Sequence, residues 1–479
     1  MHPGRLTESM KCAEVQALAK AYGQDHVFAF WETLTESEQE KLAKQVSAVD
    51  FELIRRLYEE VAKRSGPPAL DPRRLEPSPV IGLPQTQAEK DRCEQARKVG
   101  EEALRNGRIG CFLVAGGQGT RLGLSGPKGC FDVGPVRKRS LFQLHAEKIM
   151  ALRKRYGAAL PWVVMTSDAT DSATRAFFEE MFFFGLGEDT VRFCKQESLP
   201  AIGLDGRLLM ESRSSLCMSP NGHGGSIKAI HDSGCLDWLA RHGVDTLSYF
   251  QVDNVLVRIC DPVFIGHHLM AGAEMSSKVC RKRDWREKVG VIGFVDGKLS
   301  VIEYSDLPDD LAQETLPDGT LKWWAGSIAI HMLDVSFLRR LNQGGFKLPY
   351  HKAEKAIACI GPDGHPVKLK PGEKNGLKFE TFIFDALPMA KASVTVETER
   401  ALDFAPIKNA TGEDSPASAR AMLTALWASW LERAGKTVPR KADGTPDCRI
   451  DISPLTSIDG EHLGMLKIGE IKRGGDVVA

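Results

Sequence analysis

Apolar and polar positions follow different rhythms in successive parts of this chain of 479 residues. Over residues 8–65, apolar side chains recur at steps of three and four, which predicts amphipathic helices. Residues 66–84 are rich in proline and glycine and predict a strap rather than a helix. Farther along, short apolar runs alternate with helical stretches, and this alternation is typical of a mostly parallel sheet with helices on both faces.

The same patterns predict individual elements and a division of the chain. Helices are expected over residues 90–104 and 172–181, and another is expected to begin at Ser226. Apolar runs of strand length occupy residues 109–114, 162–166, 246–252, 276–280, 289–295 and 300–304. After residue 402, proline and glycine leave one helical stretch, residues 419–434, so a β-rich end is expected. We therefore predict an α/β protein in three parts: a helical segment with a strap (1–88), a central domain (89–400) and a small β-rich domain (401–479).

Composition narrows the class of protein. Lys and Arg together number 63, as do Asp and Glu, so the formal charge is zero and offers no general attraction to nucleic acid or an anionic membrane. The 11 cysteines contain no C-x-x-C pair and imply neither a disulfide framework nor a structural metal. No apolar run approaches the roughly 18 residues of a membrane span, and no signal-like segment opens the chain. We expect a soluble, cytoplasmic protein.

The most informative segment is glycine-rich and directly follows the strand predicted at residues 109–114. Residues 115–123 are Ala-Gly-Gly-Gln-Gly-Thr-Arg-Leu-Gly, and residues 126–129 are Gly-Pro-Lys-Gly. Glycines allow positive φ angles and let backbone N–H groups approach phosphate oxygens, while Arg121 and Lys128 add positive charge. The spacing fits neither a Walker A loop nor a dinucleotide fingerprint. A triphosphate site at a strand end is predicted; the alternative is a tight turn that binds nothing.

Asp253 follows the strand predicted at residues 246–252, within the sequence Gln-Val-Asp-Asn. A carboxylate at the end of a parallel strand can hold a hydrated Mg²⁺ together with substrate phosphates. The alternative is a helix N-cap or turn residue. The glycine-rich loop favours the metal site.

Two further segments carry candidate residues. Residues 219–225, Ser-Pro-Asn-Gly-His-Gly-Gly, precede the helix expected at Ser226, whose first N–H groups can reach a base, a ribose or a phosphate. His223 in this segment could equally be a hydrogen-bonded turn residue. Lys408 lies in the apolar stretch 404–409, although single lysines are usually solvated surface charges.

Taken in order, these segments resemble the eukaryotic-type UDP-N-acetylhexosamine pyrophosphorylases, relatives of the UDP-glucose and UDP-sugar pyrophosphorylases. The resemblance extends over nearly the whole chain. Besides the glycine-rich run, it rests on residues 128–134, 141–143, 165–167, 195–200, 252–254, 261–262, 288–291, 301–304, 379–385, 405–409 and 452–455.

The resemblance implies a central Rossmann-like nucleotidyltransferase domain of the glycosyltransferase-A type, with a mixed, mainly parallel sheet. It implies that UTP and a sugar 1-phosphate form a UDP-sugar and pyrophosphate, with Mg²⁺ as cofactor and no nucleic acid or membrane as partner. N-acetylglucosamine 1-phosphate is the first choice of sugar, and N-acetylgalactosamine 1-phosphate is the next. A phosphate oxygen attacks the α-phosphorus in line, so the protein has only to align two polyanions and neutralise their charge.

The resemblance also implies roles for matching residues. Arg121 would meet the departing pyrophosphate, Lys128 and Lys408 the phosphates, and Asp253 the Mg²⁺ ion. Gly116, Gly117 and Gln196 would face the uracil, with Gly222 and His223 nearby. Gly290, Glu303 and Ser327 would bind the sugar, and Phe382 and Phe384 would form a wall near its acyl group.

The chain departs from the family pattern where the sugar is expected. Many members have Gly-Asn-Ile-Ala-Asn-His, but residues 326–331 are Gly-Ser-Ile-Ala-Ile-His, so Ser327 and Ile330 each replace an asparagine. His223 stands where an asparagine is usual, and a histidine there is found in the UDP-glucose branch. A UDP-glucose or broad-specificity UDP-sugar pyrophosphorylase is therefore the first alternative. A catalytically silent nucleotide-binding relative is the second, and the presence of all four charged candidates argues against it.

Overall fold

The computed structural model describes residues 12–62 and 71–479, so the predictions for residues 8–11, 63–65 and 66–70 lie outside the described residues. The chain divides into two compact units. The smaller unit combines three segments: Met1–Pro68, Glu197–Gly225 and Leu348–Phe382. The larger unit contains the rest: Ala69–Gln196, Ser226–Lys347 and Ile383–Ala479. The three-part division predicted from the sequence stays a prediction.

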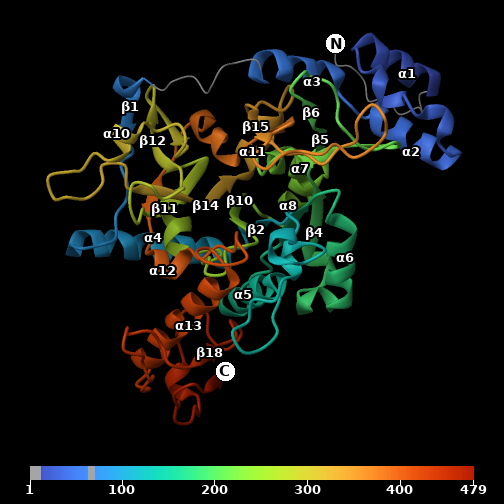
Figure 1. Ribbon diagram of the computed structural model, residues 1–479. Coiled ribbons are helices and arrows are strands. Elements are labelled where there is room, and N and C mark those ends of the chain that lie inside the picture. The colour runs from blue at the N-terminus through green and yellow to red at the C-terminus, as the bar shows by residue number, and fades with distance from the viewer. Residues whose placement is uncertain (1–11, 63–70) are drawn as a thin grey trace. The chain divides into compact units, whose positions relative to one another are not determined.

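The larger unit is built on a mixed sheet of ten strands, which confirms the α/β fold class. Four strands are parallel and adjacent, in the order β10 (Thr246–Gln251), β2 (Ile109–Val114), β3 (Trp162–Thr166) and β4 (Val191–Lys195). The apolar runs of β2, β3 and β10 are buried because helices cover both faces of a parallel sheet. Figure 1 shows β14 (Ala325–Asp334), β10, β2 and β4 following one another across the sheet.

The other half of this sheet is mostly antiparallel. β14 runs antiparallel to β10, and it also pairs with the strands of the predicted meander. The predicted strap contains a short strand that extends the sheet at β12. The remaining strands of the sheet are β1 (Leu75–Pro77), β11 (Met275–Arg281), β12 (Val291–Val295), β13 (Lys298–Ile302) and β17 (Thr395–Glu397).

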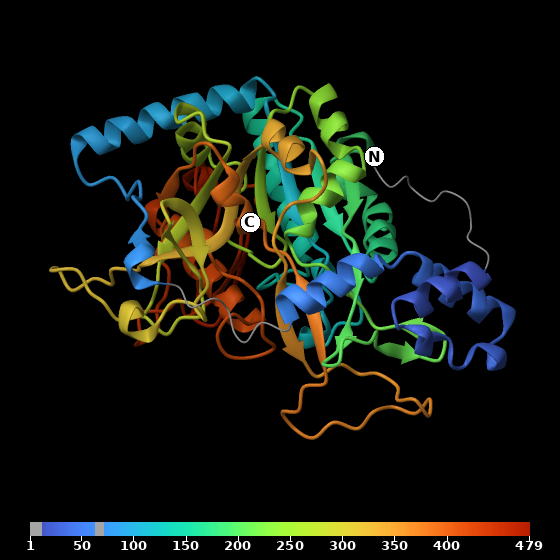
Figure 2. The same cartoon turned by 90° about the horizontal axis from the view of Figure 1, so that it is seen from above.

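Several helices of the larger unit begin where the sequence supplies caps. Thr86 and Glu89 form a capping box at α4 (Gln87–Arg105), and the Ser140 side chain accepts from the backbone of α5 (Leu141–Tyr156). The long helix α4, blue in Figure 2, crosses α9 so closely that a Cβ on Gly100 would lie 1.9 Å from the Pro262 carbonyl oxygen. The other helices are α6 (Asp171–Glu180), α7 (Gly225–Asp232), α8 (Cys235–Arg241), α9 (Pro262–Met270), α10 (Asp309–Ala312), α11 (Val335–Asn342), α12 (Arg400–Asp403) and α13 (Pro416–Arg433).

The region after residue 401 contains less strand than the sequence predicts. Its longest element is α13, and its strands are the short parallel pair β18 (Arg449–Asp451) and β19 (Asp476–Val478). The β-rich prediction for this region is therefore wrong for most of its length. Proline and glycine here produce turns instead of strand ladders, and an ion pair between Arg440 and Glu432 ties one such turn to α13.

The smaller unit packs the predicted N-terminal helices onto short strands from distant parts of the chain. Apolar side chains of α1 (Cys12–Ala21), α2 (Glu36–Ser47) and α3 (Phe51–Leu57) share a core with residues of β6 and β16. The loop between β15 and β16, orange in Figure 2, extends away from their sheet. The strands of this unit are β5 (Ser198–Pro200), β6 (Ile202–Gly203), β7 (Met210–Ser212), β8 (Ser215–Leu216), β9 (Met218–Pro220), β15 (His351–Lys355) and β16 (Gly376–Glu380).

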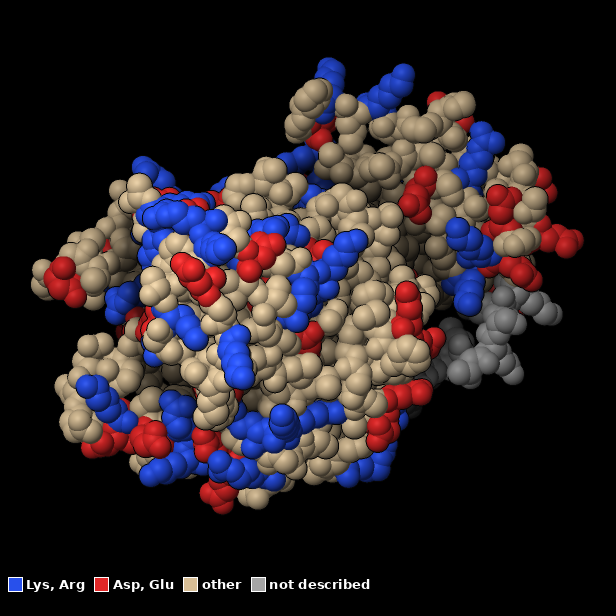
Figure 3. All heavy atoms as spheres, turned by 90° about the horizontal axis from the view of Figure 1, so that it is seen from below, with Lys and Arg blue, Asp and Glu red and all other residues tan. Residues whose placement is uncertain are grey.

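The surface carries both signs of charge. On the face drawn in Figure 3, Lys and Arg side chains lie beside Asp and Glu side chains, in keeping with the zero formal charge. Among the residues that the structure describes, no helix is long and apolar enough to cross a membrane.

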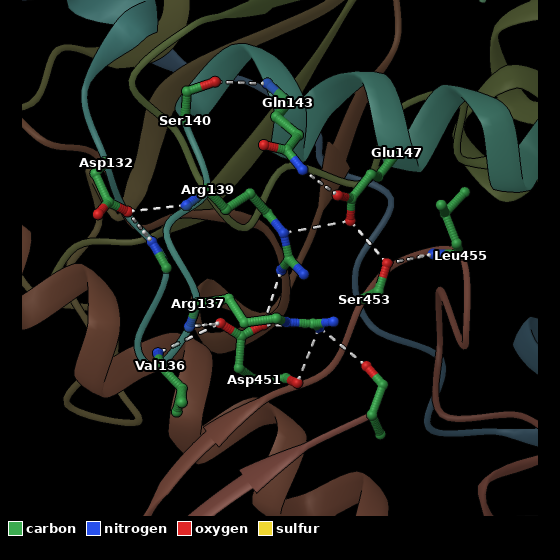
Figure 4. Close-up of polar contacts among 12 residues, drawn as sticks. Asp132, Val136, Arg137, Arg139, Ser140, Gln143, Glu147, Asp451, Ser453 and Leu455 are labelled. Carbon is green, nitrogen blue, oxygen red and sulfur yellow. Dashed lines mark hydrogen bonds and ion pairs between the residues drawn. The ribbon is translucent and has the colours of Figure 1, made fainter. Parts of the chain in front are cut away.

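A buried polar cluster joins the region after residue 401 to the loop that precedes α5. We call Arg139, Glu147, Asp451 and Ser453 the Arg139 cluster (Figure 4). The Arg139 guanidinium lies 3.3 Å from the Glu147 carboxylate and 3.0 Å from that of Asp451, and Ser453 Oγ donates to Glu147 at 2.7 Å. All four residues are buried, so this cluster fixes the path of the loop between Lys128 and α5.

Candidate active site

The site is built at the carboxyl ends of the parallel strands. Val114 of β2 pairs with Gln251 of β10, and the Val252 N–H continues the ladder by donating to the Val114 carbonyl at 3.1 Å. The glycine-rich loop and the Asp253 turn therefore leave adjacent strands although more than a hundred residues separate them. This is where α/β proteins place ligands.

The glycine-rich loop packs against two neighbouring strand ends. The Ser167 hydroxyl, just after β3, donates to the Gly116 carbonyl at 2.7 Å. A Cβ on Gly116 would lie 2.3 Å from Nε2 of Gln196, which follows β4. The Gln196 side chain is buried, and its Oε1 has no hydrogen-bond partner among the described residues. A buried amide oxygen without a partner, next to backbone that carries no side chain, is suited to bind the edge of a planar, hydrogen-bonding base.

Lys128 and Asp253, one from each of the two sequence motifs, are in contact. Lys128 opens the short 3₁₀ helix Lys128–Cys130, and its backbone N–H donates to the Gly117 carbonyl at 3.0 Å. Its ammonium donates to Asp253 Oδ2 at 3.2 Å and to the Ile407 carbonyl at 3.4 Å. Asp253 is buried, and its backbone carbonyl accepts from the Ile407 N–H at 3.0 Å. Three distant segments of the chain thus meet at Asp253.

A cavity of about 160 Å³ opens beside Asp253. Its walls come from the strand ends of β10, β12 and β14 and from the segment that ends at Lys408. Four of the predicted site residues line it: Asp253, Gly290, Ser327 and Lys408. The exposed Lys408 ammonium lies 5.7 Å from the centre of the Phe404 ring, which also lines the cavity.

The predicted sugar-binding residues are also neighbours. The Ser327 N–H donates to the Gly290 carbonyl at 2.8 Å. A Cβ on Gly290 would lie 2.7 Å from Val301 Cγ1 and 3.3 Å from Glu303 Oε1, so this backbone approaches β13 and the Glu303 carboxylate closely.

A β-bulge in β14 shapes this side of the cavity and has no signal in the sequence. Between the pairs Ser277–His331 and Val279–Ser327 the register shifts, and Ala329 adopts a φ of 54°. Left-handed backbone at a residue with a side chain is uncommon and is concentrated at functional sites. The bulge lets Ser327 and Ala329 line the cavity while Ile330 enters the apolar core.

Two further candidates of the larger unit do not line this cavity. Arg121 is exposed in the 3₁₀ helix Thr120–Leu122 of the glycine-rich loop. Phe384 is half-buried in the 3₁₀ segment Ile383–Met389. Neither lines the cavity beside Asp253.

Three candidates belong to the smaller unit, where two of them stack. The His223 and Phe382 rings are 5.3 Å apart, and Phe382 also stacks on His351 at 4.6 Å. Burial and the neighbouring His351 lower the pKa of His223 to about 4, so the ring is neutral at physiological pH. Gly222 has a φ of 85°, and a Cβ there would lie 2.4 Å from the Thr381 carbonyl oxygen. This turn requires glycine.

Two side chains of α5 hold the Asp253 turn from behind, and the sequence reasoning missed both. His145 Nε2 lies 2.9 Å from the Val252 carbonyl oxygen, and burial lowers the pKa of this histidine to about 3. The Lys148 ammonium donates to the carbonyls of Val255 at 2.7 Å and Val257 at 2.9 Å. Burial lowers the pKa of Lys148 to about 7. Their spacing of three residues on a helix is the one signal that could have paired them.

The segment that ends at Lys408 is anchored by a second set of buried contacts. The Asn254 amide donates to the Asp403 carbonyl at 2.7 Å and accepts from the Ala405 N–H at 2.9 Å. Burial would raise the pKa of Asp403, but Arg258 and Lys278 beside it hold that pKa well below its usual range. A charged, hydrogen-bonded carboxylate therefore fixes the base of this segment.

The residues present supply only part of the coordination shell of a magnesium ion, as is usual for that metal. Among residues 12–62 and 71–479, no group of three or more His, Cys, Asp or Glu side chains could hold a metal. Mg²⁺ is commonly bound by one or two carboxylates with substrate phosphates and water completing the shell. Asp253 supplies one such carboxylate, and Lys128 compensates its charge in the structure.

A larger cavity of about 880 Å³ lies elsewhere in the larger unit, between α4, β17 and the strap. None of the predicted site residues lines it. We therefore place the site at the smaller cavity, where the strand ends and charges converge.

The chain is similar to known proteins over most of its length. The profile of the family described as UTP–glucose-1-phosphate uridylyltransferase matches residues 55–441. "UDP-N-acetylglucosamine pyrophosphorylase" of Saccharomyces cerevisiae is 37% identical, over 95% of this chain and 97% of the yeast protein. "UDP-N-acetylglucosamine diphosphorylase 2" of Arabidopsis thaliana is 36% identical, over 93% of this chain and 89% of the plant protein.

Solved structures agree with this relationship. The uridine diphosphate N-acetylglucosamine pyrophosphorylase of Trypanosoma brucei, solved with an inhibitor, superposes with a TM-score of 0.79 at 28% identity and covers 96% of this chain and 95% of its own. A UDP-glucose phosphorylase of the same organism superposes with a TM-score of 0.61 at 17% identity, covering 87% of this chain and 85% of its own, which shows a shared fold. The sequence match, the strand-end site and the superposition together establish that this chain belongs to the UTP–glucose-1-phosphate uridylyltransferase family.

Proposed function

We propose that this protein transfers a uridylyl group from UTP to N-acetylglucosamine 1-phosphate, which forms UDP-N-acetylglucosamine and pyrophosphate. The observation that carries the proposal is the contact between Lys128 and Asp253 at the ends of adjacent strands, beside a cavity that Lys408 also lines. A phosphate-rich substrate pair needs this combination of cations, one carboxylate and exposed backbone.

In this proposal the protein positions the two substrates and neutralises their charge, and it forms no covalent intermediate with them. The phosphate oxygen of the sugar 1-phosphate attacks the α-phosphorus of UTP in line, and pyrophosphate leaves. Lys128 and Lys408 lower the repulsion between the two polyanions, and Arg121 on the glycine-rich loop takes charge developing on the pyrophosphate. The unpaired Gln196 amide and the backbone of Gly116 and Gly117 bind the uracil edge.

We propose Mg²⁺ as the cofactor and Asp253 as its protein ligand. A bound Mg²⁺ would neutralise part of the negative charge on the phosphates. The support for this assignment is the buried carboxylate at a strand end, held in place by the backbone contacts of Ile407 and by His145 and Lys148.

The names of the relatives support N-acetylglucosamine 1-phosphate as the acceptor, because the yeast and plant proteins are both named for the N-acetylglucosamine nucleotide sugar. Gly290, Glu303 and Ser327 are proposed to bind the hexose, with Phe384 near its acyl group. Because serine is shorter than asparagine, Ser327 leaves space beside the hexose that a water molecule can fill. N-acetylgalactosamine 1-phosphate is the second acceptor to test.

Pyrophosphate release from UTP with a panel of sugar 1-phosphates tests the proposal. We expect release with N-acetylglucosamine 1-phosphate to exceed that with glucose 1-phosphate by at least about tenfold in kcat/KM. Comparable rates would favour a UDP-sugar pyrophosphorylase of broad specificity. This is the alternative that the departures from the family pattern at Ser327 and His223 suggest. No release with any sugar 1-phosphate would contradict the proposed function.

A further inference from the structure

Lys288 stands at the cavity beside Asp253, and the proposed chemistry leaves it without a role. It lies just before β12, in the turn that leads to Gly290, and it lines the cavity together with Asp253, Ser327 and Lys408. Because Lys128 compensates the carboxylate of Asp253, Lys288 and Lys408 leave the cavity with an excess of two positive charges.

The acidic residue next to Lys288 is already engaged by other cations. Glu287 forms an ion pair with Arg400 at 2.8 Å and lies 3.6 Å from Arg283, whose backbone N–H also donates to it. Lys288 itself is exposed. Within the described part of the chain, no carboxylate forms an ion pair with it. Its ammonium is therefore available to an anion in the cavity.

The backbone that carries Lys288 is held in place. The Val289 N–H donates to the Glu287 carbonyl at 2.8 Å, and the Gly290 carbonyl accepts from Ser327 at the same distance. Val291 then pairs with Gly326 of β14. A flexible side chain on a fixed backbone lets the ammonium reach a phosphate without moving the walls of the cavity.

We propose that Lys288 is a substrate-binding residue that neutralises the phosphate of the sugar 1-phosphate. The assignment rests on the proposed function, which places the hexose beside Gly290 and Ser327. Lys288 is attached two residues before Gly290, so it lies on the acceptor side of the cavity, whereas Arg121 is on the glycine-rich loop. The ammonium binds the attacking phosphate and reduces its repulsion from the triphosphate.

Steady-state kinetics of Lys288→Met test this proposal, with the sugar 1-phosphate that the wild-type protein uses best. The substitution keeps the apolar stem and removes the charge. We expect the KM for the sugar 1-phosphate to rise about tenfold or more, as for loss of a charge-assisted hydrogen bond. The KM for UTP should change less than about threefold. In Lys288→Arg the KM for the sugar 1-phosphate should stay close to the wild-type value, since either cation can pair with a phosphate.

Lys298→Met is the matched control, because Lys298 is an exposed lysine on β13 that does not line this cavity. Its KM values should equal those of the wild-type protein. The melting temperatures of all variants should agree, since Lys288 is exposed and forms no ion pair with a described carboxylate. An unchanged KM for the sugar 1-phosphate in Lys288→Met, or a rise confined to UTP or pyrophosphate, would overturn the proposal. A wild-type protein that releases no pyrophosphate would instead contradict the proposed function.

Discussion

Replacing Asp451 by alanine should destabilise the larger unit far more than an ordinary surface change. The Asp451 side chain is fully buried and accepts from the backbone N–H groups of Val136 at 3.3 Å and Arg137 at 2.9 Å. It also lies 3.0 Å from the Arg139 guanidinium, and Arg139 is itself 4% exposed (Figure 4). Without Asp451, the positive charge of Arg139 would be balanced only by Glu147.

The expected magnitude follows from that burial. Removing one partner of a buried ion pair costs about 3–5 kcal/mol, because the other charge stays buried without compensation. The two backbone N–H groups would lose their acceptor as well, which lowers the free energy of unfolding further, although the two effects do not simply sum. Asp451→Asn keeps an acceptor oxygen and loses the charge, so its effect should be smaller than that of Asp451→Ala.

Urea unfolding followed by tryptophan fluorescence measures this effect, since Trp427 and Trp430 of α13 pack into the core of the larger unit. Arg449→Ala is the matched control, because Arg449 lies on the same strand and pairs with Asp476 while both side chains are exposed. The control should lose no more than about 1 kcal/mol. If Asp451→Ala and Arg449→Ala lowered the free energy of unfolding equally, the reasoning about the Arg139 cluster would be refuted.

The site and its surroundings lead to three further predictions. Gly116→Ala should raise the KM for UTP about tenfold or more, because the new Cβ would displace the Gln196 amide. An unchanged KM would show that this amide does not bind the uracil. Ser327→Asn should lower the KM for N-acetylglucosamine 1-phosphate by a few fold if an asparagine amide replaces a bridging water; a KM that rises or stays the same would argue against this contact. Burial lowers the pKa of His145 to about 3 and that of His268 to about 4, so between roughly pH 6.5 and pH 4 the unfolded chain binds protons that the folded chain does not. Stability should therefore fall as the pH falls through this range, and the fall in melting temperature should be smaller in a variant with both histidines replaced by glutamine.

The sequence could predict the elements that carry the site because their apolar runs are continuous. The strand expected at residues 109–114 is β2, and the run expected at 246–252 ends one residue later than β10 does. Because parallel strands end at one edge of a sheet, the sequence alone leads one to expect Lys128 and Asp253 near each other. The contact between their side chains agrees with that expectation.

Other features depend on contacts that no local pattern records. Asp451 and Ser453 are separated by about 300 residues from their partners Arg139 and Glu147. The pairing of β6 with β16 likewise joins distant segments of the smaller unit. Ala329 is left-handed because β14 places three residues opposite one residue of β11. An alanine in the sequence does not indicate such a bulge. Burial of His145 and Lys148 behind the Asp253 turn likewise becomes visible only when the helix is packed on the sheet.

Calorimetric titration of Mg·UTP into the wild-type protein and into Asp253→Asn tests whether the strand-end site binds the nucleotide. We expect a measurable heat of binding to the wild-type protein, which requires magnesium and is much weaker in the variant. Folded wild-type protein that takes up no UTP at saturating magnesium, or binding to Asp253→Asn that equals the wild type, would contradict this expectation.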